Sequence, residues 1–449
     1  ISIQTFNSQA FIEKTTPEFY DYIIVDEFHH AAAPTYQKLL SYYNPQILLG
    51  LTATPERMDG KSILPYFSNR IAAEIRLPEA IDRKLLCPFQ YFGVTDTVDL
   101  DNLKWAAGGY DKGKLSRIYT LSGMMANRRA DLVVTSLLKY VTDIDDVKGL
   151  GFCVTVEHAE FMSNYFNARG IPSMFLTGHS PDEERKEAKA RLVKGEVRFI
   201  FVVDIYNEGV DIPEVNTVLF LRPTESLTVF LQQLGRGLRL SEDKECLTVL
   251  DFIGQANKKY NFEDKFAALL SNTTRGVTRE IKDGFISLPK GCYIQLEKKA
   301  ARYILDNIRA SYGNSAGLVA HIATFEEDTG LKLTLENFLD HYRLDSRSIY
   351  KFSSFSRLCA RADIIDNFEE PIEEVMSKAL SRFALVDSRR WIVFMLRVLE
   401  NIDQFDLMRL SNIEKRMLQM LYITMWGKAV EDWNADEVFE ISKFFQIAR

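Results

Sequence analysis

Two adjacent carboxylates follow a short run of apolar, β-branched residues near the start of the chain. Residues 22–25 have the composition of a buried strand, and Asp26 and Glu27 come directly after them. Open parallel sheets bind their ligands at the carboxyl ends of the strands. One carboxylate there can hold Mg²⁺ while its neighbour orients and deprotonates water, as phosphoryl transfer to water requires. Most Asp-Glu pairs in loops are simply solvated, so this pair alone is weak evidence, and other motifs must support a catalytic role.

A second group of residues contains two arginines at helical spacing. Gln232, Gly235, Arg236 and Arg239 form the pattern Q-x-x-G-R-x-x-R. On a helix the two guanidinium groups lie about one turn apart, so both can reach the same phosphate group. Lysine performs this task poorly, because it lacks the planar fork of donors that matches phosphate oxygens. We therefore predict that this segment stabilises charge on a transferring phosphate.

Two further segments stand between these groups, each after an expected strand. Residues 52–54 (Thr-Ala-Thr) follow a strand over 46–51, and their small hydroxyl side chains suit a junction that shifts against a metal site. Gly209 and Asp211 follow a strand over 199–204. The glycine permits close approach of the backbone, and the carboxylate offers an acceptor for a ribose hydroxyl.

The elements that must position these residues alternate between strand and helix. Residues 1–78 and 129–257 both predict parallel sheets covered by helices, which gives an α/β fold class with a partial first domain. Residues 79–128 predict a connector with an edge strand near 89–94. Long helical periodicity over 258–449 predicts a mostly α-helical C-terminal domain.

Composition narrows the class of protein. Of 449 residues, 46% are hydrophobic and 26% are charged, which excludes disordered and collagenous chains. No apolar run is long enough to span a membrane and no signal peptide is visible, so we expect a cytoplasmic protein with no membrane partner. The five cysteines lack zinc-ligand spacing. A net charge of −7 means that any phosphate-binding surface must be local.

Taken in order, the motifs resemble those of the superfamily 2 helicases and translocases, whose motor has two RecA-like domains. The resemblance covers roughly residues 1–255 and rests on segments similar to motifs II, III, IV, V and VI, namely 26–29, 52–54, 151–155 with 177–179, 204–211 and 232–239. The Asp-Glu-Phe-His-His run and the Gly-Arg-Gly-Leu-Arg form of motif VI most resemble the branch of restriction-enzyme-like DNA helicases. Some members carry a helical C-terminal domain of unknown function, similar in size to residues 258–449.

The resemblance implies ATP and Mg²⁺ as cofactors, with ATP held between the two RecA-like domains. The implied catalytic residues, with Asp26 as the Mg²⁺ ligand, are Asp26, Glu27, His29, Arg236 and Arg239. The residues implied to bind ATP or to couple its hydrolysis to movement are Thr52, Ala53, Thr54, Gly209, Asp211, Gln232 and Gly235. The candidate nucleic-acid contacts are Gln4, Thr5, Arg57, Thr155, Thr177, Gly178 and His179.

One motif of the family is missing. The phosphate-binding loop G-x-x-x-x-G-K-[ST] should precede motif II by many tens of residues, yet only 25 residues precede Asp26. The Gly-Lys-Ser at 60–62 has Pro55 where the first glycine belongs and follows motif III, so we interpret it as a loop. We expect a fragment that begins inside the first motor domain and hydrolyses ATP negligibly alone, from an intact ATPase stimulated by nucleic acid.

Three functions remain open from the sequence. The chain is an ATP-driven helicase or translocase acting on nucleic acid, with DNA expected; or a nucleic-acid-binding module without its own ATPase; or the motor portion of a restriction or phage-defence nuclease, with the nuclease upstream or on a partner. A basic row in the helical domain is either a phosphate-facing stripe or a solvated face: Arg343, Arg347, Lys351, Arg357 and Arg361. Glu297-Lys298-Lys299 superficially resembles a nuclease E-x-K, but we expect it to be structural.

Overall fold

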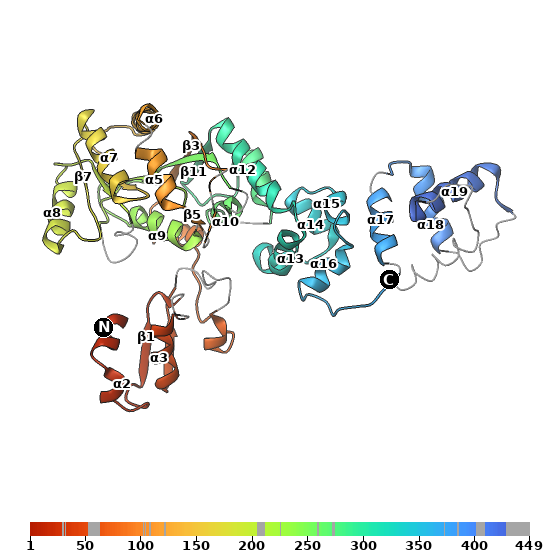
Figure 1. The fold of residues 1–449 in the computed structure, drawn as a ribbon, viewed down its shortest axis with the longest axis horizontal. Helices are drawn as coiled ribbons and strands as arrows, with labels where there is room; N and C mark the ends of the chain where they lie inside the picture. The colour runs from red at the N-terminus through yellow and green to blue at the C-terminus, as the bar shows by residue number, and fades with distance from the viewer. Residues whose placement is uncertain are drawn as a thin grey trace. The chain divides into compact units, whose positions relative to one another are not determined.

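The computed structural model describes most of the chain, in two compact units (Figure 1). The first comprises Ile1–Asn272 with Asp283–Asn307, and the second Thr273–Lys282 with Ile308–Arg449. The residues outside the description are 29, 30, 32, 53–62, 102, 104, 107, 108, 121, 122, 204–211, 225, 258, 259, 272, 273, 372, 384, 385, 401–408 and 428–449.

A small parallel sheet opens the first unit, and we call residues 1–75 the N-terminal lobe. Its elements are α1 (Ile3–Ser8), α2 (Phe11–Lys14), β1 (Tyr22–Val25), α3 (Pro34–Tyr42), β2 (Ile47–Gly50) and the 3₁₀ helix η2 (Leu64–Phe67). Strands β1 and β2 pair in parallel, with Val25 opposite Gly50. One sheet face is covered by a hydrophobic cluster. Phe28 is fully buried in it, and the partly buried Tyr36 and Leu40 of α3 pack against it.

The opposite face of this two-stranded sheet is bare. Alternate residues of a strand point to opposite faces, so one face carries large apolar side chains that are 39–65% exposed: Tyr22, Ile24, Ile47, Leu49 and Leu51. Parallel sheets are normally covered on both faces. This face of the lobe therefore has the character of a surface that packs against further polypeptide.

The main sheet has seven parallel strands in the order β11-β3-β10-β9-β6-β8-β7. The strands are β3 (Phe89–Asp99), β6 (Gly149–Phe152), β7 (Ser173–Phe175), β8 (Phe199–Val202), β9 (Thr217–Phe220), β10 (Leu247–Gln255) and β11 (Tyr293–Leu296). The expectation of an edge strand near 89–94 was wrong, because β3 lies between β10 and β11. Its residues are almost continuously buried, as an interior parallel strand requires.

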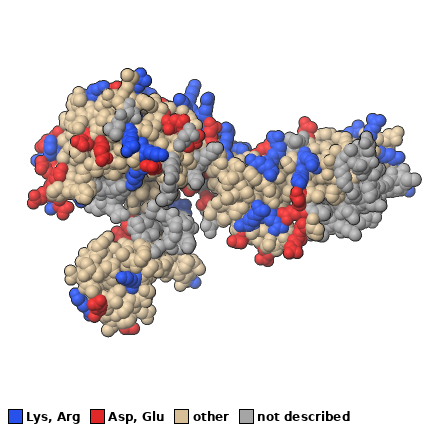
Figure 2. Space-filling model, in the orientation of Figure 1, with Lys and Arg blue, Asp and Glu red and all other residues tan. Residues whose placement is uncertain are grey.

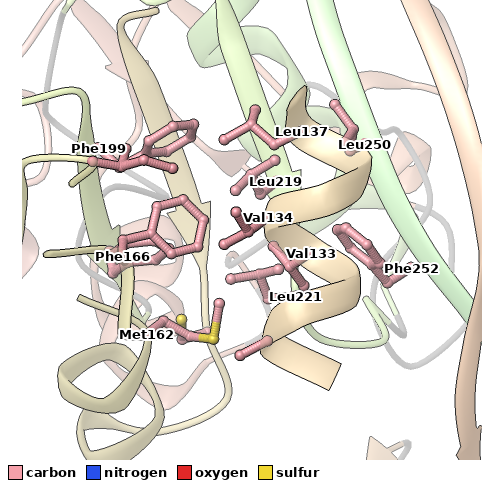
Figure 3. Packing of buried hydrophobic residues seen from close by; sticks show 14 of the residues in the cluster. Val133, Val134, Leu137, Met162, Phe166, Phe199, Leu219, Leu221, Leu250 and Phe252 are labelled. Atoms are coloured by element: carbon pink, nitrogen blue, oxygen red, sulfur yellow. The ribbon is translucent and has the colours of Figure 1, made fainter. Parts of the chain in front are cut away.

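Helices cover both faces of the main sheet. The remaining elements of the first unit are α4 (Leu77–Asp82), β4 (Trp105–Ala106), β5 (Gly109–Tyr110), α5 (Lys112–Thr120), α6 (Met124–Tyr140), α7 (Val156–Ala168), α8 (Asp182–Val193), α9 (Leu227–Leu238), α10 (Phe262–Ala267) and α12 (Lys298–Ser311), which runs on into the second unit. On one face, Val134 and Leu137 of α6 and Phe166 of α7 pack on Phe199 and Leu219 (Figure 3). On the other, the ring of Phe230 in α9 contacts that of Phe220, and Phe266 in α10 contacts Tyr91.

The second unit is helical, which confirms the α-helical C-terminal region. Its helices are α11 (Val277–Asp283), which ends just inside the first unit, α13 (Ser315–Thr329), α14 (Leu335–Tyr342), α15 (Ser346–Tyr350), α16 (Phe355–Arg361), α17 (Glu373–Phe383), α18 (Arg389–Glu400) and α19 (Asn412–Trp426). Strand β11 and most of α12 belong to the first unit, so the helical unit does not begin at the expected residue 258. Within the described residues, none of the helices combines the length and apolar character that a membrane span needs.

Much of the basic row in the helical unit is already paired with carboxylates. Arg343 pairs with Asp340, and Arg347 pairs with Asp345. Arg357 forms a less exposed pair with Glu373. Both signs of charge share the visible face of this unit (Figure 2). These local pairs favour a solvated, internally balanced surface over a phosphate-facing stripe.

A buried ionic group ties the main sheet to α10. The ammonium of Lys265 and the hydroxyl of Tyr91 both donate to Asp251 Oδ2, and the side chains of Lys265 and Asp251 are 5% and 6% exposed. Lys265 also lies over the rings of Phe220 and Phe230. Burial, followed by the nearby Asp251 charge, raises the pKa of Tyr91 well above its usual value. Because the group is buried, removing either donor would deprive the Asp251 carboxylate of a partner that water cannot replace.

Removing the cation from this group should be strongly destabilising. We expect Lys265→Met to lower the free energy of unfolding by about 3–5 kcal/mol, because it leaves a buried carboxylate without its counter-ion. Urea unfolding followed by circular dichroism measures the loss. The triple change Lys265→Met, Asp251→Leu and Tyr91→Phe should recover most of it. Arg83→Met, which removes an exposed pair with Glu79, should change stability by less than about 1 kcal/mol. Equal losses from Lys265→Met and Arg83→Met would refute this account.

Candidate functional site

The two carboxylates lie at the carboxyl end of β1, where the strand pairing fixes their loop. Leu51 N donates to Val25 O at 2.9 Å, and Phe28 N donates to Leu51 O at 2.8 Å, so the backbone after β1 is bonded to the backbone after β2. Asp26 is exposed, and its Oδ1 accepts from Glu27 N at 2.9 Å. Thr52 follows Leu51 directly. The register therefore brings the start of the Thr-Ala-Thr segment beside the carboxylates.

The buried ring of Phe28 packs under this loop and holds it against the lobe. An added Cβ at Gly50 would lie 2.5 Å from Phe67 Cζ and 2.9 Å from the Phe28 ring. Phe28 is completely buried and packs edge-on against Phe67. A larger residue at position 50 would displace an aromatic ring, so glycine allows this ring to fill the space under the carboxylate loop. The sequence gives no local signal for this contact, because Phe67 is remote along the chain.

Glu27 has an unusual backbone conformation. Its φ is +50°, in the left-handed region that side chains other than glycine rarely adopt. Such strain persists where the surroundings impose it, and it concentrates at functional sites. Here the bonds that join the loops after β1 and β2 leave the chain little freedom. The backbone geometry therefore supports a specialised role for Glu27.

The arginine segment forms the C-terminal part of α9. Ser226 caps the start of the helix, and Gln233, Leu234, Gly237 and Leu238 are buried. Gln232 and Arg236 are four residues apart and share a less buried helix face, while Arg239 follows the last turn. Gln232 Nε2 donates to Glu27 Oε1 at 3.3 Å. This hydrogen bond joins two predicted site residues that are 205 positions apart in the sequence.

Several predicted site residues lie outside the described part of the chain: His29, Ala53, Thr54, Arg57, Gly209 and Asp211. Their proposed roles remain predictions. Among the residues that the structure describes, the candidate site consists of Asp26, Glu27, Thr52, Gln232, Gly235, Arg236 and Arg239. The hydrogen bond between Gln232 and Glu27 joins its two halves.

Two candidate nucleic-acid contacts are hydroxyl residues that take part in local hydrogen bonds at the start of a helix. Thr155 is the N-cap of α7; its Oγ1 accepts from His158 N at 3.3 Å and lies 2.7 Å from Ser116 Oγ. Thr5 Oγ1 lies 2.9 Å from Ser2 Oγ, the N-cap of α1, on which Gln4 is exposed. These hydrogen bonds give the hydroxyl groups of Thr155 and Thr5 a structural role.

The other candidate nucleic-acid segment is a tight turn before α8. Thr177 N donates to Ser180 Oγ at 3.2 Å, and His179 N donates to Thr177 Oγ1 at 3.2 Å. Gly178 O accepts from Arg185 Nη2 at 3.0 Å. Gly178 and His179 are exposed. The turn therefore presents an exposed glycine and imidazole from a fixed backbone, a form that can approach a phosphate backbone closely.

Two sets of buried or part-buried contacts outside the predicted site join elements that are distant in the sequence. Arg129 in α6 donates to Asp96 Oδ2 at 2.8 Å and to Leu221 O at 2.9 Å, with Arg129 and Asp96 both 2% exposed. Glu297 Oε2 accepts from Thr95 N at 2.9 Å, which gives the E-x-K segment the structural role that we expected. Pairs separated by 33 and 202 positions carry no local pattern that could reveal them.

The donor set at β1 fits a phosphate-bound Mg²⁺. Magnesium is usually held by one or two carboxylates together with substrate phosphates and waters. Asp26 provides one exposed carboxylate beside Glu27 and the Thr52 position. Among the described residues, no group of three or more His, Cys, Asp or Glu side chains could hold a metal unaided. The chemistry therefore matches an ion that arrives with a nucleotide.

Fold and site together define a class: an α/β protein with carboxylates at the tip of a parallel strand and an arginine-bearing helix packed on a second parallel sheet. Comparison with known families agrees. Residues 1–57 match the family model of the type III restriction enzyme, res subunit, and residues 133–241 match that of the helicase conserved C-terminal domain. Over these two segments the chain is similar to the superfamily 2 helicases, and it is related to helicase-family ATPases.

Curated relatives are similar over about half of this chain. The putative ATP-dependent helicase IRC3 of Saccharomyces cerevisiae is 28% identical over 52% of this chain and 34% of its own length. A 51.5 kDa protein of a Lactococcus phage is 29% identical over 51% of this chain and 48% of its own length. Among solved structures, a fragment of a putative HsdR subunit of a type I restriction enzyme from Vibrio vulnificus YJ016 has a TM-score of 0.46 and 22% identity, over 64% of this chain and 50% of that chain. The chain thus spans less than half the length of the yeast relative and of the phage relative.

Because Glu27 has a left-handed backbone, we expect glycine to be more stabilising than alanine at this position, which is the reverse of the usual order. We expect Glu27→Gly to be about 1 kcal/mol more stable than Glu27→Ala, because only glycine adopts this φ without strain. At Glu18, where φ is not positive, alanine should be at least as stable as glycine. Urea unfolding of the four variants gives the comparison. The same order of alanine and glycine at both positions would exclude strain at Glu27.

Proposed function

We propose that this chain is part of an ATP-dependent DNA helicase or translocase. ATP would lie between the carboxylates at the tip of β1 and the arginines of α9. The observation that carries the proposal is the hydrogen bond from Gln232 to Glu27, which links the carboxylate loop to the helix bearing Arg236 and Arg239. Acids on one side and guanidinium groups on the other are the arrangement that hydrolysis of a nucleoside triphosphate needs.

In this proposal each site residue has a distinct task. Asp26 would hold Mg²⁺, which when bound neutralises charge on the nucleotide phosphates. Glu27 would orient water and accept its proton, and the strained backbone holds its carboxylate in place for this. Arg236 and Arg239 would stabilise the charge on the transferring phosphate. Gln232 would make Glu27 responsive to the position of α9, so closing of the site and proton transfer become coupled.

DNA as the partner is supported by the names of relatives rather than by a described contact. A 28% identical relative is the type I restriction enzyme EcoAI endonuclease subunit of Escherichia coli, and a 25% identical one is the DNA 3'-5' translocase XPB2 of Sulfurisphaera tokodaii. The nucleic acid would be held mainly through its phosphates, by the turn at Thr177 to His179 and by exposed residues of the N-terminal lobe. The restriction-enzyme relative also favours, as a second candidate, the motor portion of a nuclease complex. A cytoplasmic location is part of the proposal.

The bare face of the N-terminal lobe bears on how the ATP site is completed. Its five exposed apolar residues lie on the sheet that carries Asp26 and Glu27. Burying such a face stabilises a parallel sheet, at roughly 25 cal/mol per Å² of apolar surface. We infer that further polypeptide covers this face and supplies the phosphate-binding loop that residues 1–25 lack.

The first test concerns the need for that loop. The 449-residue chain alone should release phosphate from ATP at the background rate. A longer polypeptide that also carries a Gly-Lys-Thr loop ahead of residue 1 should turn over ATP, and DNA should accelerate it. Phosphate release with and without duplex DNA measures both. Robust turnover by the 449-residue chain alone would refute the missing-loop interpretation.

The second test concerns Glu27. In the longer polypeptide, Glu27→Gln should lower kcat by about 10²–10⁴-fold while ATP still binds, because the amide keeps the shape but cannot accept the proton. Phosphate release gives kcat, and binding of a fluorescent ATP analogue gives affinity. Glu184→Gln, an exposed carboxylate on α8, is the matched control and should leave both unchanged. Unaltered turnover by Glu27→Gln would remove Glu27 from this role.

A further inference from the structure

We propose that Lys244 is a positioning residue that joins the turn after motif V to the end of the motif VI helix. Its ammonium lies among three backbone carbonyls from two different segments. Nζ donates to Pro213 O at 2.5 Å, to Val215 O at 3.1 Å and to Gly237 O at 3.2 Å. An ammonium has three N–H donors, so this geometry uses all of them. We call this arrangement the Lys244 clamp.

The first partner of the clamp is the C-terminal end of α9. The last carbonyls of a helix have no partner within the helix, and the helix dipole makes this end negative. Lys244 satisfies Gly237 O, and Cys87 donates from its backbone N to Leu238 O at 2.8 Å. Arg239 follows at once as the C-cap, in an extended conformation. The direction in which Arg239 leaves the helix therefore depends on how this last turn is held.

The second partner is the turn formed by residues 212–216. Val215 N donates to Ile212 O at 3.2 Å, which closes the turn. Asn216 fixes its far side: Asn216 Nδ2 donates to Asp146 O at 2.8 Å, and Lys148 N donates to Asn216 Oδ1 at 2.9 Å. Lys244 holds the side that faces α9. The turn is thus fastened to the start of β6 by Asn216 and to the motif VI helix by Lys244.

The clamp matters because of what the two segments carry. The turn follows the segment that resembles motif V, and α9 carries the motif VI arginines. Hydrogen bonds from a charged donor are stronger than those between neutral groups, so three of them resist separation of the segments. The clamp would make the turn at residues 212–216 and the motif VI helix move as one element. This catalytic consequence rests on the proposed function, whereas the mechanical link does not.

The mechanical link is tested on the 449-residue chain by hydrogen–deuterium exchange with mass spectrometry. Lys244→Met keeps the length of the side chain and removes its donors, so amides of residues 212–216 and of the last turn of α9 should exchange about tenfold faster or more. Lys244→Arg should restore slow exchange in part, because a guanidinium also donates to carbonyls. Lys186→Met, an exposed lysine on α8, is the matched control and should match the wild type.

Two exchange results would overturn the clamp. Unchanged exchange in both segments of Lys244→Met would show that the ammonium does not hold them. Equal acceleration in α7, elsewhere on the same sheet, would show general loosening instead of a local link. If Lys244→Met fails to fold, Lys244→Gln keeps two N–H donors and should give an intermediate rate; wild-type rates in Lys244→Gln would equally overturn the proposal.

The positioning role is tested by turnover in the longer polypeptide described above. Misplaced arginines weaken binding of the transition state more than that of ATP, so Lys244→Met should lower kcat about tenfold while KM for ATP stays within about twofold. Lys244→Arg should recover part of kcat. An unchanged kcat in Lys244→Met would overturn the positioning role. If no polypeptide turns over ATP, the proposed function fails, and the exchange measurement still decides the clamp.

Discussion

Parallel pairing of β1 with β2 is the constraint on which the candidate site depends. Because Val25 lies opposite Gly50, both strands end at the same edge, and Leu51 and Phe28 bond the two following loops together. That bonding brings Asp26 and Thr52 to one edge and coincides with the left-handed backbone at Glu27. The pairing thus fixes the carboxylate side of the candidate site through contacts within the N-terminal lobe itself.

Buried ion pairs constrain the packing of the second sheet. Asp251 with Lys265, and Asp96 with Arg129, replace water by fixed partners inside an otherwise apolar core. Such pairs add little net stability over apolar side chains, but losing one partner is costly, so they discourage other packings. Lys265 lies against Phe230 of α9, and Arg129 reaches the carbonyl of Leu221 after β9. Both pairs therefore contact elements that bear or flank the candidate site.

The sequence predicted elements well where a local pattern existed. The apolar run before Asp26 and the helix that contains Arg236 are both present, because strand and helix periodicities are local properties. The strand near 89–94 is present, but its position at a sheet edge was predicted wrongly, because its neighbour β11 is remote in the sequence and is only four residues long. No window of sequence contains the information that pairs these two strands.

Residue types and spacing by themselves indicated the superfamily 2 resemblance, the α/β class and the candidate acids and arginines, since these follow from local chemistry. Only the tertiary structure decided that Gln232 meets Glu27, that Thr155 caps a helix and that three carbonyls surround Lys244. The reason is physical: hydrogen-bond partners are selected by distance and burial in the folded chain. Residues separated by many positions become neighbours only when the sheets have formed.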